Sequence, residues 1–343
     1  MIESSNSYKT WVPHPSDDCW RFGGEQRTSN RQSIWLPHPG RAFCGLGGNR
    51  KWSLFIVLVI SVIAAITASA QKNPFTDANP SWVQSFPPFK IAGNLYYVGS
   101  QDLAAYLIVT PQGNILINSN LESSPPQIKQ AIETLGFKYA DTKILLISHG
   151  HFDHCAGSAQ VKRETHAKYE VMAEDLPVVE SGGRNDFHYA HDRSMWFPAT
   201  KVDRTLHDGD TVSLGAVTLT AHLTAGHTKG TTTWTLDEQD NGRTLHVVIV
   251  GSPNVNPGYK LVNNETYPQI ADDYRHQFEV LSKLHCDIFL GAHGGYFGLH
   301  EKYERFKNGD KNAFIDPAGY KSYIPQRQQA FDSELKKQSA TKH

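Results

Sequence analysis

Cysteine is scarce in this chain, and neither sign of charge is in excess. The 343 residues include four Cys, and 33 Lys and Arg stand against 34 Asp and Glu, for a net charge of −1. A balanced charge gives no reason to expect nucleic acid as a partner. Only Cys155 and Cys286 lie beyond residue 70, and a strand starting at Cys286 would hold it roughly 20 Å from the residues around Cys155. We therefore expect two buried free thiols and no disulfide.

Long apolar runs are also rare, and the one present is short for a membrane anchor. It covers residues 52–65 (WSLFIVLVISVIAA), follows Arg50-Lys51 and precedes small residues that end at Ala70. A spanning helix needs about 20 apolar residues, whereas a basic start, a short apolar stretch and a small-residue ending describe a secretory signal peptide. We predict a signal peptide at 50–70 and a periplasmic or secreted protein without stable membrane insertion after cleavage.

The polar segment ahead of this signal peptide does not resemble a folded domain. Residues 1–49 are rich in Pro, Gly and Arg and lack apolar periodicity. We expect them to be poorly ordered, or to lie upstream of the true translation start. Residues 71–343 then form one domain of ordinary size, which we expect to be a monomer.

Four potential metal ligands crowd into six positions after a buried apolar run. Residues 143–148 (KILLIS) have the composition of a strand, and the string SHGHFDH covers 148–154. Zinc accepts imidazole and carboxylate ligands. The four potential ligands are His149, His151, Asp153 and His154. We expect Gly150 to relax the turn so that their side chains converge. The alternative is a solvated, His-rich turn, since the chain holds 17 His.

Two further histidines follow apolar strands in glycine-rich turns. They are His227 in AGHTKG (225–230) and His293 in GAHGG (291–295). We predict that a first zinc is held by His149, His151 and His227, and a second by Asp153, His154 and His293. Three protein ligands per zinc leave positions open, as in catalytic rather than structural zinc sites. The other histidines, His246 and His285 among them, lack such a setting, and we expect them at the surface or beside the ligands.

Strand-like and helix-like segments occur in the same order twice. The first set has strands at 94–98, 104–109, 114–118 and 143–148 and a helix at 124–135; the second has strands at 217–223, 231–236, 245–250 and 287–291 and a helix at 267–284. Strands followed by helices in both halves predict two packed β-sheets with helices outside, an α+β fold. Residues 177–200 are predicted to be a mobile loop.

The ligand string and the two later histidines resemble the metallo-β-lactamase superfamily. The resemblance implies a four-layer αβ/βα sandwich with two Zn2+ at the sheet edges. Glyoxalase II enzymes and lactonases of this superfamily carry a bridging Asp after a buried strand, where this chain has VIVGSP (248–253) with Ser252 at that position. The third subclass of class B β-lactamases likewise has Ser there. The similarity to that subclass also covers residues 87–99, 202–210, 219–234 and 257–261.

The resemblance also implies roles for individual residues. Asp153 would orient a metal-bound hydroxide that hydrolyses the β-lactam amide bond of antibiotics without a covalent intermediate. Tyr259 would lie near the substrate carbonyl, Ser252 beside the ligands, and Asn254 near the substrate carboxylate. A lactonase or other small-ester metallohydrolase of the same fold is the alternative. Metal binding without catalysis is a third possibility, which open coordination positions disfavour.

Overall fold

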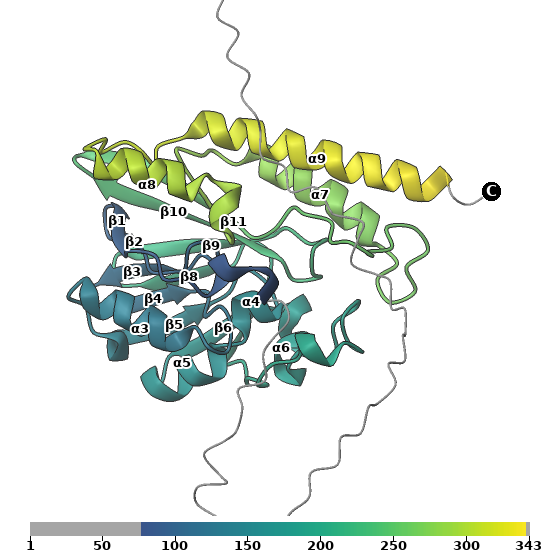
Figure 1. Ribbon diagram of the computed structural model, residues 1–343, viewed down its shortest axis with the longest axis horizontal. Helices are drawn as coiled ribbons and strands as arrows, with labels where there is room; N and C mark the ends of the chain where they lie inside the picture. The colour runs from purple at the N-terminus through teal and green to yellow at the C-terminus, as the bar shows by residue number, and fades with distance from the viewer. Residues whose placement is uncertain (1–76, 341–343) are drawn as a thin grey trace, which may run out of the picture. The chain divides into compact units, whose positions relative to one another are not determined.

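Two β-sheets face each other in the centre of the protein, and helices cover their outer sides (Figure 1). The computed structural model describes residues 77–340. The expected extension at 1–49 and the signal peptide at 50–70 lie outside the described residues. The layers run helix, sheet, sheet, helix, which confirms the predicted α+β sandwich.

The first sheet has seven strands in the order β1-β2-β3-β4-β5-β6-β7. Their bounds are β1 Phe89–Ala92, β2 Leu95–Tyr97, β3 Tyr106–Thr110, β4 Gly113–Ile117, β5 Thr142–Leu146, β6 Lys168–Met172 and β7 Arg204–Leu206. Strands β1 to β4 pair antiparallel, and β4 to β7 pair parallel. A parallel strand ends at the same sheet edge as its neighbour, so the residues after β5 and β6 begin on one side of the sandwich.

The second sheet has five strands in the order β12-β11-β10-β9-β8. Their bounds are β8 Thr211–Leu214, β9 Val217–Leu223, β10 Thr232–Asp240, β11 Arg243–Val250 and β12 Ile288–Gly291. Strands β11 and β12 are parallel, so the residues after both strands lie at one edge. At this edge the Thr232 amide donates to the Ser148 carbonyl oxygen at 2.7 Å, and the Trp234 indole donates to the Ile147 carbonyl oxygen at 3.0 Å. These bonds join the two sheets where β5 ends.

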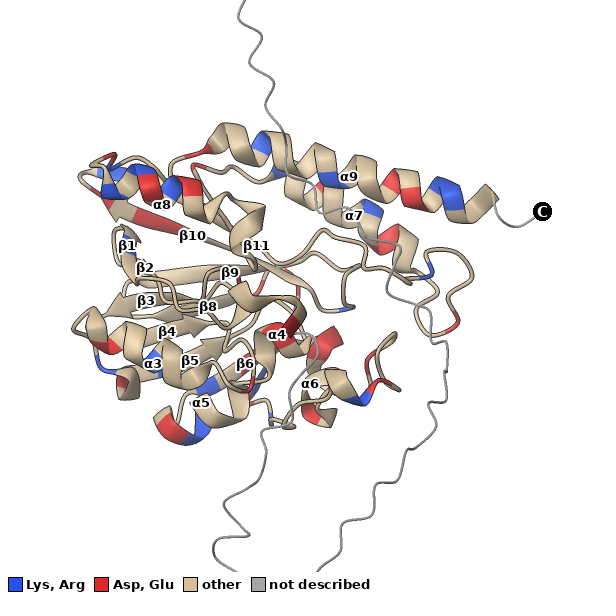
Figure 2. Ribbon diagram, viewed as in Figure 1, with Lys and Arg blue, Asp and Glu red and all other residues tan. Residues whose placement is uncertain are grey.

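Helices form the two outer layers. The α-helices are α3 Pro125–Thr134, α4 Phe152–Cys155, α5 Ser158–Thr165, α6 Leu176–Ser181, α7 Ile270–Lys283, α8 Leu299–Lys307 and α9 Pro317–Ala340. Short 3-10 helices are η1 Pro80–Trp82, η2 Tyr139–Asp141, η3 Ala173–Asp175, η4 Arg193–Met195 and η5 Gly294–Tyr296. Both basic and acidic side chains occur on α8 and on α9 (Figure 2), in keeping with the balanced net charge. Within residues 77–340, no helix has the length and apolar character that crossing a bilayer requires.

The alternating side chains of the strands build two apolar cores. Tyr106 and Ile108 of β3 point to the core between the sheets, whereas Leu107 points to the core beneath α3 and α5. This alternation is the period of two that a strand imposes. Trp234, which is 1% exposed, belongs to the inter-sheet core. The cores hold both sheets in place, and with them the loops at the edges.

Several boundaries and several elements differ from the sequence-based expectations. Residues 176–181 form α6 instead of a loop, because Leu176, Val178 and Val179 pack on the core beneath the first sheet. The C-terminal helices α8 and α9 were not predicted. Tyr320, Ile324 and Phe331 are the buried residues of α9, and they are too widely spaced for a clear apolar stripe. Cys155 and Cys286 are buried free thiols, as predicted.

Candidate metal centre

The ligand string lies between the end of β5 and the short helix α4. The Ser148 amide donates to the Asn118 side-chain oxygen at 2.8 Å, and Asn118 itself has a left-handed backbone with φ of 68°. His151 is extended with ψ of 153° and is the N-cap of α4, which carries Asp153 and His154. The backbone therefore leaves β5 after Leu146, passes through His149 and enters a helix at Phe152. This change of direction lets the four side chains face one region.

Gly150 has a different role from the one expected. Its φ is not positive, so the loop does not require a backbone conformation that only glycine adopts readily. Instead, a Cβ at Gly150 would lie 3.3 Å from the Asp175 carboxyl, and the Gly150 amide donates to Asp175 Oδ2 at 2.7 Å. The glycine permits close approach to this buried carboxylate.

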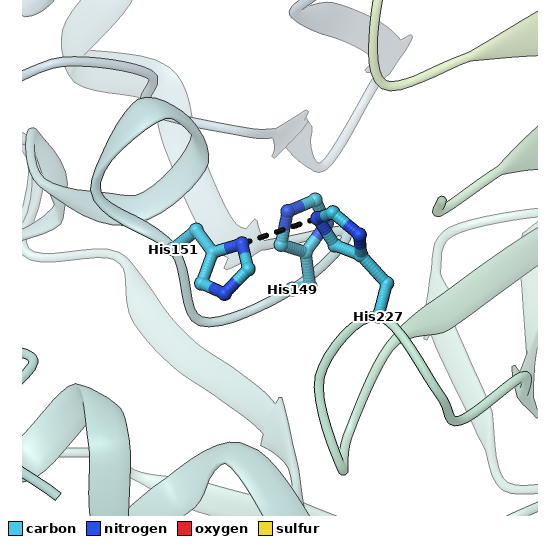
Figure 3. A group of neighbouring side chains, drawn as sticks. All are labelled: His149, His151 and His227. Carbon is cyan, nitrogen blue, oxygen red and sulfur yellow. Dashed lines mark hydrogen bonds between the residues drawn. The ribbon is translucent and has the colours of Figure 1, made fainter. Parts of the chain in front are cut away.

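His149, His151 and His227 form the first cluster of metal donors (Figure 3). One nitrogen from each lies within 4.8 Å of the others. His151 Nδ1 and His227 Nε2 are 3.1 Å apart, and the His149 and His227 ring centroids are 4.6 Å apart. His227 comes from the loop between β9 and β10, so the second sheet supplies the third imidazole.

A second cluster lies directly beside the first. His149, Asp153 and His154 each offer a donor atom within 4.8 Å of the others. His293, which follows β12, places Nε2 3.2 Å from His154 Nε2 and 3.5 Å from Asp153 Oδ2. The structure thus brings together all six residues that the sequence nominated as metal ligands.

The bonding of these side chains fits a metal. Among the described residues, neither ring nitrogen of His149 has a hydrogen-bond partner, although both are buried. His227 Nδ1 lies 2.8 Å from the Asn254 carbonyl oxygen and must donate to it, which leaves the Nε2 lone pair facing the cluster. Burying polar atoms without hydrogen-bond partners costs free energy. A divalent transition metal that accepts these imidazole lone pairs would remove that cost.

Electrostatics favour the ligand forms of several of these groups. Burial lowers the pKa of His149 well below its usual value and, with the charge of His151, brings that of His227 to about 3. Burial alone would raise the pKa of Asp153, but the charges and hydrogen bonds of His154 and His293 outweigh it and hold that pKa well below the ordinary range. Neutral imidazoles and an ionised carboxylate are the forms that bind metal.

Two carboxylates, the partly buried Asp102 and the buried Asp186, orient one ligand in each cluster, and the sequence did not indicate either. Asp102 Oδ2 accepts a hydrogen bond from His293 Nδ1 at 2.8 Å, and Asp186 Oδ2 lies 3.5 Å from His151 Nε2. Such carboxylate–histidine pairs fix the imidazole tautomer in metal sites. Asp102 also accepts from the Trp82 indole and the Gly295 amide. Both aspartates lie in irregular segments, where periodicity gives no signal.

A third carboxylate, Asp175, is fully buried and joins the two ligand loops. Asp175 is 0% exposed; beside the Gly150 amide it accepts the Gly230 amide at 2.9 Å and the Thr228 hydroxyl at 2.8 Å. Burial raises its pKa to about 6 despite these bonds. Because a Cβ at Gly230 would lie 2.5 Å from the Asp175 backbone nitrogen, only glycine fits there without movement. Asp175 therefore sets the distance between the His151 and His227 loops.

The other nominated residues lie around the clusters. The Tyr259 hydroxyl donates to the His227 carbonyl oxygen at 2.9 Å and lies 3.4 Å from His151 Nε2. Ser252 is buried, and its hydroxyl lies 3.1 Å from the Tyr296 hydroxyl. Asn254 orients His227 through its carbonyl oxygen, while its side-chain oxygen accepts from Arg327 of α9 at 3.4 Å. The sequence did not indicate Arg327.

The segment after α6 packs against this centre. Phe187 contacts the Tyr259 ring at a centroid distance of 4.9 Å, and the Tyr189 ring lies 5.5 Å from that of His151. The Tyr189 hydroxyl accepts from the Asn256 side chain at 3.1 Å. Trp196 instead stacks beneath Arg184, at 4.4 Å from the ring centroid. Phe187 and Tyr189 thus line one side of the centre, and Trp196 packs within the segment.

Comparison with known proteins agrees with this geometry. The profile of the metallo-beta-lactamase superfamily matches residues 103–293. The FEZ-1 metallo-beta-lactamase from Legionella gormanii is 59% identical, with a TM-score of 0.74 over 75% of this chain and 98% of that chain. The subclass B3 enzyme BJP-1 of Bradyrhizobium japonicum is 38% identical, with a TM-score of 0.72 over 78% of this chain and 100% of that one.

A third solved structure is the class B3 di-zinc enzyme LRA-12 from an Alaskan soil metagenome. It is 37% identical, with a TM-score of 0.72 over 75% of this chain and 97% of that chain. The profile match spans more than half of the sequence, and the donor clusters contain the groups that a metal-dependent family requires. The chain belongs to the metallo-β-lactamase superfamily and, within it, to subclass B3.

Proposed function

We infer that this protein is a zinc-dependent β-lactamase that hydrolyses the amide bond of β-lactam antibiotics without a covalent intermediate. The observation that carries this inference is the pair of donor clusters meeting at His149. The relatives above are named metallo-β-lactamases, and the FEZ-1 enzyme is 59% identical over 75% of this chain. The Ser252 hydroxyl is buried against Tyr296, so it is not placed to act as a nucleophile.

We assign two Zn2+ to the centre. His149, His151 and His227 would hold one ion, and Asp153, His154 and His293 the other. When bound, these ions supply a water with a pKa of about 7 and a Lewis acid for the lactam carbonyl. Each cluster combines residues that follow β5 with a histidine from the second sheet, and the Asp175 bonds hold the loops of His151 and His227 at a fixed spacing.

The side chains of the centre then bind and orient the reactants. The charges and hydrogen bonds of His154 and His293 hold the pKa of Asp153 low, so its carboxylate would accept a hydrogen bond from the attacking water and orient that water toward the carbonyl carbon. Tyr259 is 2% exposed and its hydroxyl is engaged with the His227 carbonyl oxygen. We therefore assign Tyr259 to positioning the His227 loop; contact with a substrate carbonyl would require it to leave that bond.

Recognition of the substrate carboxylate is assigned to Asn254 and Arg327. Arg327 Nη1 lies 3.4 Å from Asn254 Oδ1, and the Asn254 carbonyl oxygen accepts from the ligand His227. The Arg327 guanidinium therefore lies beside Asn254, whose carbonyl oxygen orients the ligand His227. An anionic substrate gains from such a fixed cation.

We also propose that the protein is exported and works in the periplasm or outside the cell. The support is the basic pair Arg50-Lys51, the apolar run at 52–65 and the small residues that end at Ala70. N-terminal sequencing of the protein recovered from a periplasmic fraction tests this proposal. A mature N-terminus at Gln71 is expected.

The function is tested by turnover of a chromogenic cephalosporin before chelation, after chelation and after zinc is restored. We expect turnover that the chelator abolishes and zinc recovers. Asp153→Ala should lower kcat roughly 10²–10⁴-fold, the usual contribution of a positioned acid–base group, while the far-ultraviolet circular dichroism is unchanged. A parallel assay with a lactone separates the two hydrolases: turnover of the lactone alone would refute the β-lactamase assignment.

A further inference from the structure

A third donor cluster lies away from the catalytic centre. It contains His246 of β11, His285 after α7, and Asp287 just before β12, each offering a donor atom within 4.8 Å of the others. In residues 77–340 it is the one His, Cys, Asp or Glu group of this kind that shares no residue with the catalytic centre. His246 lies four residues before the end of β11, so roughly 13 Å of strand separates it from the loop that holds Ser252.

The backbone holds this cluster in place. The His246 amide donates to Asp287 Oδ2 at 2.9 Å, and the Asp287 amide donates to the His246 carbonyl oxygen at 2.8 Å. Just beyond these bonds, β11 and β12 pair as parallel strands from Val247 and Ile288. The sheet therefore fixes the backbone of two of the three donors, His246 and Asp287, which lowers the conformational entropy that would be lost on binding a metal.

A fourth residue sets the His246 ring. Asp237 pairs with His246 across β10 and β11, and Asp237 Oδ1 lies 2.7 Å from His246 Nδ1. A carboxylate at one ring nitrogen favours the tautomer that leaves Nε2 as a lone-pair donor, which is the arrangement seen behind metal-binding histidines. Asp237 therefore orients the imidazole of His246, as Asp102 orients that of His293.

The chemistry of the cluster selects the kind of ion. His285 Nε2 lies 3.4 Å from Asp287 Oδ1, and the His246 and His285 ring centroids are 4.5 Å apart. Two imidazoles with one carboxylate suit zinc, copper or nickel rather than magnesium or calcium. The side chains of His246 and His285 are 40% and 71% exposed, so water can reach the ion and complete its coordination.

We propose that His246, His285 and Asp287, with Asp237 orienting His246, form a third divalent transition-metal site that is separate from the catalytic centre. The ion would join β11, the segment after α7 and the start of β12. Because it binds the folded chain and finds no such arrangement in the unfolded one, it stabilises the fold.

The test is a zinc titration of protein whose catalytic centre is already loaded, followed by calorimetry and by metal analysis after dialysis. We expect one further equivalent of zinc in the wild type and a rise in Tm with excess zinc. His246→Ala and His285→Ala should lose that equivalent, and Asp237→Asn should weaken it about 10–100-fold. Turnover of the cephalosporin should be unchanged in all three variants.

His276→Ala is the matched control. His276 is an exposed histidine of α7 that pairs with Glu279 at 4.0 Å and belongs to no donor cluster; its variant should keep the additional equivalent. The proposal is overturned if the loaded wild type takes up no further zinc, or if the His285→Ala variant retains the additional ion. Since His285 is mostly exposed, its variant remains informative even where His246→Ala impairs folding. The catalytic zinc content is counted separately, so failure of the third site is distinguishable from failure of the β-lactamase assignment.

Discussion

Exchange of the two orienting carboxylates for amides should weaken the two metal positions separately. Asp102 contacts His293, a ligand of the proposed second zinc, and Asp186 faces His151, a ligand of the first. Asp102→Asn and Asp186→Asn keep the size of each side chain and remove its charge. The pair therefore provides a crossed experiment in which each variant is the control for the other.

The expected size of each effect follows from the donors around each carboxylate. Asp102 Oδ1 accepts the Gly295 amide, and Oδ2 accepts His293 and the Trp82 indole. One amide oxygen cannot serve both groups, so Asp102→Asn places an NH2 against an N–H donor. Loss of such an orienting carboxylate costs about 10–100-fold in metal affinity, which corresponds to roughly 1.4–2.7 kcal/mol.

The Asp186→Asn substitution should change which ring nitrogen of His151 carries the proton. Asp186 Oδ1 already accepts the His188 amide at 2.7 Å and the Tyr189 amide at 2.6 Å. The amide oxygen will keep these two bonds, and the new NH2 will face His151 Nε2. That contact favours a proton on His151 Nδ1, the nitrogen that faces His227 across 3.1 Å. The first zinc should therefore be weakened by a similar factor.

Competition of each variant against a chromophoric chelator gives the two dissociation constants. We expect Asp102→Asn to raise one constant, Asp186→Asn to raise the other, and the double variant to raise both. The cobalt-substituted Asp102→Asn protein should retain the absorption of the three-imidazole site at one equivalent. Weakening of the same equivalent by both variants, or of neither, would refute the assignment of one carboxylate to each metal.

Three further predictions concern the supporting residues. Gly230→Ala forces a Cβ to within 2.5 Å of the Asp175 backbone nitrogen, so chemical denaturation should show a loss of about 1–3 kcal/mol, and unchanged stability would contradict the packing argument. Arg327→Gln should raise KM for a cephalosporin about tenfold with a smaller change in kcat, because it removes a cation near Asn254; an unchanged KM would exclude the carboxylate role. Burial raises the pKa of Glu238 to about 7, so the folded chain binds more protons than the unfolded one between about pH 4.5 and 7, and stability should fall as pH rises through that window. Glu238→Gln should flatten this slope in urea titrations at several pH values, and an unaltered slope would mean that another group causes it.

The sequence by itself determined most of the strands around the site and the ligands that follow them. Strands such as β9, predicted at its observed bounds Val217–Leu223, show apolar patterns over a few neighbouring residues. The string from His149 to His154 is equally local, because its donors sit within one strand end and one helical turn. Patterns of this kind are set by backbone geometry and can be read without knowing the path of the chain.

Only the tertiary structure decided which distant residues support those ligands. Asp102 and His293 are 191 positions apart, and Asp175 and Gly230 are 55 apart. Their contacts depend on the order of strands in two sheets and on the path of the loops between them. Nothing in the residues beside His246 and His285 marks them as neighbours, yet strands β10, β11 and β12 bring them together with two carboxylates. A hydrogen bond or a metal site needs atoms a few ångströms apart, and the packing of the sheets supplies that distance where local sequence cannot.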